Sequence, residues 1–87
     1  MQKNQNWYTY MVRCNDGTYY TGITNDLEKR LKAHNDGSGA KYTMPRRPVK
    51  LVYCETYPDR SEATQREIQL KKFTKAQKEI LISDGDA

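Results

Sequence analysis

The sequence predicts a small mixed domain of three strands and three helices in the order β-β-α-β-α-α. Three tyrosine-bearing segments alternate polar and apolar residues, as strands do, and they cover residues 7–14, 18–24 and 49–57. Pairs of polar capping residues indicate helices at about 26–35, about 59–73 and a short segment after Thr74.

The length and composition indicate one folded unit. The chain has 87 residues, of which 36% are hydrophobic, and its mean hydropathy is -1.05, so its apolar core is modest. The apolar residues nevertheless recur periodically, which argues against disorder. We expect a single domain over residues 1–87, with a core at about 7–82 and polar ends at 1–6 and 83–87.

The charge balance indicates a polyanionic partner. Lys and Arg number 15 against 11 Asp and Glu, which gives a formal net charge of +4 and a pI near 9.1. The N-terminal residues lack the apolar run of a signal peptide, and no segment approaches the ~20 apolar residues of a membrane span. We therefore expect a cytoplasmic protein with no membrane partner.

The two cysteines, Cys14 and Cys54, both fall in strand-like segments. In a cytosolic protein such a pair is more often reduced than bridged by a disulfide or bound to a metal. We expect both to be small buried side chains.

Residues 15–17, Asn-Asp-Gly, predict a tight turn between the first two strands. A two-residue loop would send Tyr10 and Tyr20 to opposite faces of the hairpin. A three-residue loop closed by a left-handed Gly17 and a bulge instead places Tyr10 opposite Gly22 and both tyrosines on one face. We predict the three-residue loop, with Gly17 and Gly22 as structural turn glycines.

Three reciprocal capping pairs predict the starts of the helices, and residues 35–37 predict the end of the first helix. The pairs are Asn25 with Glu28, Asp59 with Glu62, and Thr74 with Gln77.

In the first helix, Leu27 and Leu31 form the apolar spine. At ~100° per residue, His34 falls on this spine and Arg30 at its edge, so both face inward or toward a cleft. A lone histidine on an apolar face is more often a satisfied core residue than a ligand, and an arginine on a capped helix is more often solvated or paired. Both alternatives stay open at this point.

The segment 36–48 is rich in glycine and proline and reads as a basic loop. It is either a solvated connector or a surface that contacts a nucleic-acid backbone and stacks on bases, and we prefer the second interpretation. Its four candidate nucleic-acid-binding residues are Lys41, Tyr42, Arg46 and Arg47.

The second half of the chain supplies one strand and a carboxylate. In residues 49–57, Val49, Leu51 and Tyr53 alternate with their neighbours and are expected on one face. In the following helix, Glu67 lies beside the buried stripe of apolar residues, although it could also form a surface ion pair with Lys71 one turn later.

Together, Tyr10, the triplet Tyr20-Thr21-Gly22, Arg30 eight residues after that glycine, and Glu67 on a late helix resemble the GIY-YIG endonuclease superfamily. The stretches YTGIT, GAKYT and RRP make the sequence similar to its small stand-alone bacterial subgroup. The resemblance covers about residues 7–82.

This resemblance implies an α+β fold, a three-stranded antiparallel sheet flanked by helices, and hydrolysis of nucleic-acid phosphodiesters with one Mg²⁺ or Mn²⁺ ion. Glu67 would be the sole protein carboxylate on the metal, which would bind weakly without substrate. Arg30 would bind the phosphate, while Tyr10 and Tyr20 would orient water and phosphate, one of them acting as base. His34 would hydrogen-bond the phosphate or a tyrosine.

The chain departs from the family pattern at several points. Tyr8 stands at the first glycine of the GIY triplet, Ile23 stands where some members have lysine, and no asparagine follows the metal-binding helix. The chain also shows none of the attached DNA-binding domains on which many members rely.

Two functions follow as expectations. The first is a metal-dependent endonuclease that is structure-selective or weakly sequence-selective, with DNA favoured over RNA as its substrate. The alternative is a catalytically weak or inactive module that binds nucleic acid and acts with a protein partner. A protein-interaction domain with incidental charge is a third, weaker interpretation.

Overall fold

The computed structural model describes residues 6–85, and its three strands form one antiparallel sheet in the order β2-β1-β3. The strands are β1 (Trp7–Arg13), β2 (Tyr19–Thr24) and β3 (Lys50–Tyr57). The helices are α1 (Leu27–Asp36), α2 (Arg60–Lys71) and α3 (Lys75–Gly85), with a short 3-10 turn, η1 (Met44–Arg46). The predicted element order and the antiparallel sheet are confirmed.

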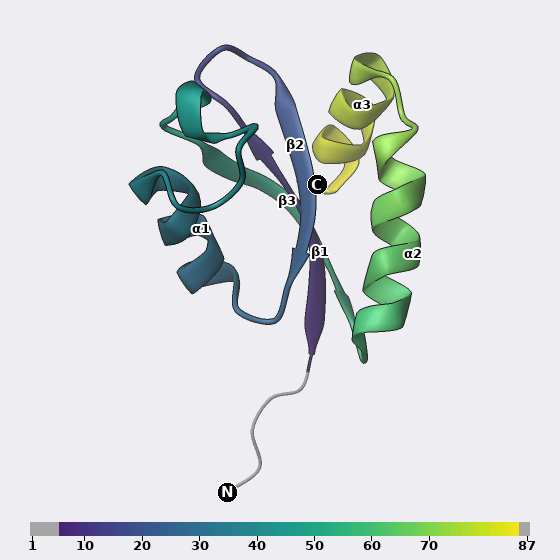
Figure 1. The fold of residues 1–87 in the computed structure, drawn as a ribbon. Coiled ribbons are helices and arrows are strands. Elements are labelled where there is room, and N and C mark those ends of the chain that lie inside the picture. Colours follow the sequence, from purple (N-terminus) through teal and green to yellow (C-terminus); the bar gives the residue numbers. More distant parts are fainter. Residues whose placement is uncertain (1–5, 86–87) are drawn as a thin grey trace, which may run out of the picture.

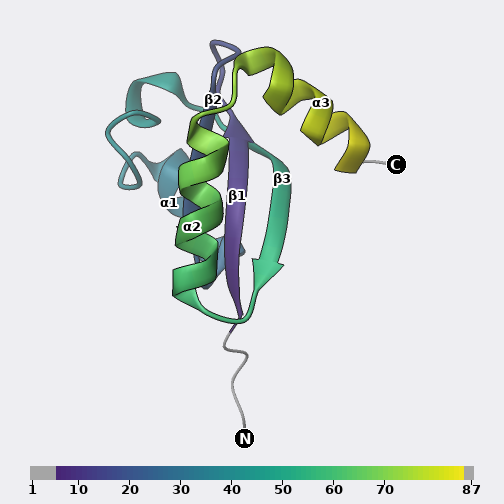
Figure 2. The same ribbon diagram turned by 90° about the vertical axis from the view of Figure 1, so that its right-hand side faces the viewer.

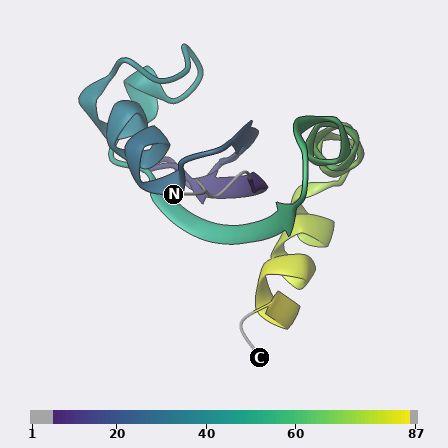
Figure 3. The same ribbon diagram turned by 90° about the horizontal axis from the view of Figure 1, so that it is seen from below.

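The sheet separates α1 from α2, which lie on its opposite sides (Figures 1 and 3). Figure 2 shows α2 running along β1, with α3 beside β3. Tyr10 and Val12 point to the side of α1, called the α1 face. Thr9 points to the other side, the α2 face, where its hydroxyl donates to the Ala63 carbonyl of α2 at 2.8 Å.

The hairpin between β1 and β2 has the predicted register. The Gly17 N–H donates to the Cys14 carbonyl at 2.9 Å, and Gly17 has φ 85°, the left-handed conformation that the loop needs. As a result, Tyr10 lies opposite Gly22 in the ladder. The three-residue loop therefore places Tyr10 and Tyr20 on one face, as predicted.

Helix α1 begins one residue later than predicted. Its N-cap is Asp26, whose side chain accepts the Lys29 N–H at 3.0 Å, so the expectation of Asn25 was wrong. The Thr24 hydroxyl accepts the Asp26 N–H at 3.1 Å and thereby places Asp26 at the extended cap position. The predicted stop is confirmed by Gly37, which caps the helix with φ 91°.

The other predicted capping pairs are confirmed by hydrogen bonds. The Glu62 N–H donates to Asp59 at 2.9 Å, and Thr74 and Gln77 cap each other reciprocally at 2.9 and 3.1 Å. Helix α3 then continues through Gly85 and so extends into the predicted polar end at 83–87, where Ser83 and Asp84 are exposed. The predicted polar end at 1–6 lies outside the described residues, apart from Asn6.

Apolar residues are buried on both faces of the sheet, with Met11, Ala63 and Leu70 on the α2 face and a larger cluster between the sheet and α1. Tyr10 and Val12 are almost fully buried there, and the helix contributes its predicted spine. The buried members of this cluster are Tyr10, Val12, Cys14 and Val49, against which Tyr20, Leu27, Leu31 and Leu51 pack.

Strand β3 contains a bulge that the sequence pattern did not predict. Val12 pairs with Leu51, but the preceding residue Met11 pairs with Tyr53, so Val52 is an extra residue in the ladder. Tyr53 consequently points to the α2 face, and the expectation that it shares a face with Val49 and Leu51 was wrong.

Both cysteines are free, but only Cys14 is buried. Cys54 is exposed because it lies on β3, an edge strand of the sheet, so the prediction that it is buried was wrong. Among residues 6–85, no helix has the length and apolar character required to cross a membrane.

Candidate active site

The Tyr10 hydroxyl is the centre of the candidate site. It lies 2.8 Å from Nε2 of His34 and accepts a hydrogen bond from Nε of Arg30 at 3.3 Å. Tyr10 comes from the central strand β1, whereas Arg30 and His34 lie one turn apart on α1. The helix therefore presents both side chains to the same hydroxyl, which belongs to a tyrosine that is only 2% exposed.

Gly22 makes room for that hydroxyl. A Cβ at this position would lie 2.6 Å from the Tyr10 oxygen, which is too close for any side chain. Gly22 lies inside β2 rather than in a turn, so its assignment as a turn glycine was wrong. Its absent side chain lets the Tyr10 ring lie over the edge strand β2.

Tyr20 completes the aromatic side of the site. Its ring meets the His34 ring edge-on, with centroids 5.3 Å apart and planes at 66°. The hydrogen bond from Arg30 to Tyr10 raises the pKa of the Arg30 guanidinium, and interaction with Tyr20 adds to this effect. Both tyrosines therefore stabilise the positive charge of Arg30.

His34 is completely buried, and its surroundings favour the neutral imidazole. Burial lowers the pKa of its imidazole, and the nearby positive charge of Arg30 lowers it further. Its other ring nitrogen, Nδ1, lies 2.9 Å from the Thr43 hydroxyl. Gly39 lies so close that a Cβ there would be 2.5 Å from Nδ1. Sequence reasoning missed Thr43 and Gly39 as site residues, although both lie within the GAKYT stretch.

Arg30 carries a positive charge that no carboxylate in the described part of the chain neutralises. None of the ion pairs within residues 6–85 includes it. It also borders an open hollow of about 280 Å³, whose lining includes Lys29 and the N-cap residue Asp26. An arginine with free donors beside an open hollow is suited to bind a phosphate group.

Glu67 projects from α2, which packs against β1 and β2 from the other side of the sheet. Burial raises the pKa of the Tyr10 hydroxyl, and the negative charge of Glu67 adds a smaller increase, whereas Arg30 opposes both. Glu67 therefore acts on Tyr10 through space and makes no hydrogen bond to it in the described part of the chain. The Oε2 atom of Glu67 lies 3.4 Å from Nζ of Lys71, so the two residues form the ion pair that the sequence offered as the alternative role of Glu67.

A metal ion at this site would have one protein ligand. Within residues 6–85, no group of three or more His, Cys, Asp or Glu side chains could hold a metal ion. Glu67, with one fifth of its side chain exposed, offers a hard oxygen ligand of the kind that Mg²⁺ and Mn²⁺ accept alongside water and phosphate oxygens. The donor set therefore fits a weakly held divalent cation.

The loop residues divide into two groups. Tyr42 stacks on Tyr20 with ring centroids 6.0 Å apart, and the Arg46 guanidinium lies 4.0 Å above the Tyr42 ring. Arg46 also pairs with Asp16 of the hairpin turn at 3.0 Å. This stack fastens the loop to the tyrosine side of the site, while Lys41 remains exposed.

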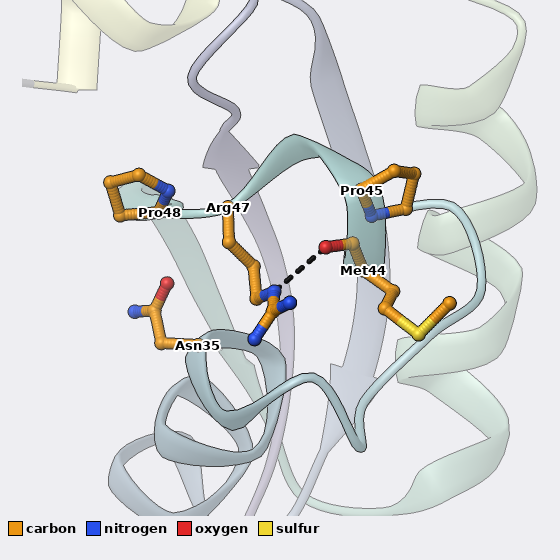
Figure 4. Close-up of a pocket in the computed structure, with 5 residues that line it drawn as sticks. All are labelled: Asn35, Met44, Pro45, Arg47 and Pro48. Carbon is orange, nitrogen blue, oxygen red and sulfur yellow. Dashed lines mark hydrogen bonds between the residues drawn. The ribbon is translucent and has the colours of Figure 1, made fainter.

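Arg47 is also engaged within the protein (Figure 4). Its Nε donates to the Met44 carbonyl at 2.7 Å, and its guanidinium lies against Gly37 at the end of α1. It borders an open pocket of about 460 Å³, whose lining residues are Asn35, Met44, Pro45, Arg47 and Pro48. Both predicted loop arginines therefore help to shape the loop.

Over residues 6–79, the chain that forms this sheet and this cluster matches the family described as the GIY-YIG catalytic domain, which supports a protein of a nuclease class. The chain belongs to the GIY-YIG family, whose domain implies a nucleic-acid substrate.

Within this family, the chain is similar to small UPF0213 proteins. It is 48% identical over 82 residues to UPF0213 protein YazA of Bacillus subtilis, an alignment that covers 94% of this chain and 83% of that protein. It is 57% identical over 76 residues to a UPF0213 protein of Clostridium perfringens, covering 87% of this chain and 82% of the other. The predicted family and its small-protein subgroup are thereby confirmed.

Two solution NMR structures resemble this fold. One is of a protein from E. faecalis, with 43% identity, a TM-score of 0.64 and coverage of 97% of this chain and 90% of that chain. The other is of a UPF0213 protein from Bacillus halodurans, with 42% identity, a TM-score of 0.58 and coverage of 91% and 84%. They confirm the predicted fold class.

Proposed function

We propose that this protein is a divalent-metal-dependent endonuclease that hydrolyses phosphodiester bonds in DNA, with selectivity for structure more than for sequence. The observation that carries this proposal is the unneutralised guanidinium of Arg30, held beside two tyrosine hydroxyls at an open hollow. Phosphodiester hydrolysis builds negative charge on the phosphate, and a preorganised positive fork stabilises that charge.

Tyr10 is the residue best placed to accept a proton from the attacking water. Arginine can only donate, so among the described residues the Tyr10 hydroxyl proton has one hydrogen-bond acceptor, Nε2 of His34. As Tyr10 takes a proton from water, it can pass its own proton to His34. Tyr20 has no hydrogen bond to His34 among residues 6–85 and orients the phosphate through Arg30.

Glu67 would hold the divalent cation from the side of α2, within electrostatic reach of Tyr10. When bound, the cation would polarise the phosphate and stabilise the leaving oxygen. The nearby charge of Glu67, which raises the pKa of Tyr10, supports a carboxylate within electrostatic reach of the reacting groups.

The loop would guide the nucleic acid toward Arg30. Exposed Lys41 could contact a backbone phosphate. Tyr42, Arg46 and Arg47 would form the surface against which the nucleic-acid strand lies. A surface this small reads shape more than sequence, so a protein partner would add specificity.

The test is a panel of labelled DNA and RNA substrates, duplex, nicked, branched and single-stranded, incubated with Mg²⁺ or Mn²⁺. We expect metal-dependent cleavage of a DNA substrate by the parent protein and by Glu62→Gln, a control on the first turn of α2. Glu67→Gln should lose cleavage while it retains salt-dependent binding. Binding without cleavage by the parent protein, unaffected by Glu67→Gln, would instead establish the nucleic-acid-binding module.

A further inference from the structure

Thr43 is a fully buried polar residue in the loop between α1 and β3, immediately before η1. Its hydroxyl has two partners, Nδ1 of His34 at 2.9 Å and the Ala40 carbonyl at 3.0 Å. Buried hydroxyls are satisfied by hydrogen bonds, and here one of the two partners is the histidine that contacts Tyr10.

The direction of these hydrogen bonds can be derived from both ends. At one end, Arg30 only donates, so Nε2 of His34 is the one acceptor that the described residues offer to the Tyr10 proton. At the other end, the Ala40 carbonyl only accepts, so the Thr43 proton goes to it and the Thr43 oxygen is left to accept from His34. The two derivations agree on a neutral imidazole with its proton on Nδ1.

The loop holds Thr43 in this position from several sides. A Cβ on Gly39 would lie 2.5 Å from Nδ1, so the loop backbone is in direct contact with the imidazole. At its other end, the Arg46 carbonyl accepts the Asn15 N–H at 2.9 Å, and the Arg46 guanidinium pairs with Asp16. The hydroxyl is therefore preorganised against the ring.

We propose that Thr43 is a positioning residue, which holds His34 in the Nδ1-protonated form so that Nε2 stays free to receive the Tyr10 proton. Its catalytic consequence rests on the proposed nuclease function, whereas the protonated nitrogen is a property of the folded protein alone. A different tautomer would turn Nε2 into a donor, and Tyr10 could no longer deliver its proton there.

The first experiment reads the tautomer directly. His34 is the only histidine of the chain, so the imidazole nitrogen signals of a ¹⁵N-labelled sample belong to it without ambiguity. We expect the Nδ1-protonated tautomer in the parent and in Thr43→Ser, which retains the hydroxyl. Thr43→Val removes the acceptor and should shift the tautomer ratio by about tenfold or more toward protonated Nε2.

The second experiment measures cleavage. Thr43→Val should lower kcat with KM unchanged, because substrate binding uses Arg30 and the loop, and Thr43→Ser should restore most of the rate. The pH profile of cleavage should change in Thr43→Val and stay that of the parent in Thr43→Ser. The charged and titratable groups that face His34, namely Arg30, Tyr10 and Tyr20, are the same in both variants, so a change would come from the lost hydroxyl.

Two results would overturn the proposal: protonated Nε2 in the parent protein, or an unchanged tautomer in a folded Thr43→Val variant. If Thr43→Val does not fold, the parent spectrum and the comparison of Thr43→Ser with Thr43→Ala decide in the same way. Protonated Nδ1 in a parent protein that cuts nothing would support the role of Thr43 and reject the nuclease function.

Discussion

Each face of the sheet holds a cluster of one arginine and two tyrosines. The two clusters differ in whether a carboxylate pairs with the arginine. On the α2 face, Arg66 grips both oxygens of Glu55 at 2.8 and 3.1 Å, and the hydroxyls of Tyr53 and Tyr57 donate to the same carboxylate at 2.5 Å. On the α1 face, Arg30 has a tyrosine partner and no carboxylate within the described residues.

The pKa of a tyrosine hydroxyl is raised on both faces, and the clusters differ in whether the arginine is paired with a carboxylate. Burial and the hydrogen bonds to Glu55 raise the pKa of Tyr53 to about 12 and that of Tyr57 to about 12, so these hydroxyls keep their protons. The arginine of that cluster is neutralised, and its role is to hold β3 against α2. The comparison teaches that free positive charge, more than the presence of tyrosine and arginine, separates the candidate site from a structural cluster.

The largest difference should appear when one hydroxyl is removed from each face. Tyr10→Phe should lower kcat about 10²- to 10⁴-fold, because it removes the group that we propose accepts the water proton. Tyr57→Phe removes a hydroxyl from the other cluster and should leave kcat unchanged. Single-turnover cleavage of the best DNA substrate measures both, and equal losses in the two variants would erase the distinction between the faces.

Exchanging each arginine for lysine tests the geometry of the charge. Arg30→Lys keeps the charge but loses the fork, and it should lower kcat/KM about 10- to 100-fold, the value of one or two charge-assisted hydrogen bonds. Arg66→Lys should leave kcat/KM unchanged and lower the free energy of unfolding. Full activity of the Arg30→Lys variant would show that charge alone suffices.

The α2 face should contribute to the pH dependence of stability through Glu55. Burial alone would raise the pKa of Glu55, but hydrogen bonds from Arg66, Tyr53 and Tyr57 outweigh it, so its pKa lies below the usual value. Ionised Glu55 therefore contributes stability that is present above the unfolded pKa of about 4.3 and is lost as pH falls through the folded pKa.

Urea unfolding from about pH 7 down to about pH 3 measures this contribution. Glu55→Gln should be about 1–3 kcal/mol less stable at neutral pH and should lose less stability on acidification than the parent. Parallel pH curves for the two proteins would contradict a stabilising role for the ionised carboxylate.

The smallest effect concerns the lysine that pairs with Glu67. Lys71→Ala removes a half-exposed competitor for the carboxylate and should lower the Mn²⁺ concentration needed for half-maximal cleavage by about two- to fivefold. Lys72→Ala removes the next charge along the helix and should not change this concentration. An unchanged Mn²⁺ requirement in Lys71→Ala would mean that the pair does not oppose metal binding.

Local chemistry explains which parts of the structure the sequence could predict. The Asn-Asp-Gly turn determines the register of Tyr10 and Tyr20 through backbone geometry alone, and the pairs Asp59 with Glu62 and Thr74 with Gln77 act within one helical turn. The alignment of Arg30 and His34 on one side of α1 follows from the helical period in the same way.

The remaining features depend on contacts between distant segments. The contact of Thr43 with His34 requires a loop that turns back onto α1, and no local pattern specifies this path. The choice of Asp26 over Asn25 as N-cap depends on a hydrogen bond with Thr24, and both residues satisfy the same sequence rule. The bulge at Val52 follows from the packing of β3 on both faces of the sheet.

That bulge changes the side on which β3 presents its residues. Before Val52, the apolar Leu51 contributes to the core beneath α1; after it, Tyr53 and Glu55 point toward α2. In an uninterrupted pleat, Glu55 would instead point to the side of Arg30, where a carboxylate would compete with phosphate for the guanidinium. One surplus residue in an edge strand thus keeps a carboxylate and the arginine that we propose binds phosphate on separate sides of a sheet only three strands wide.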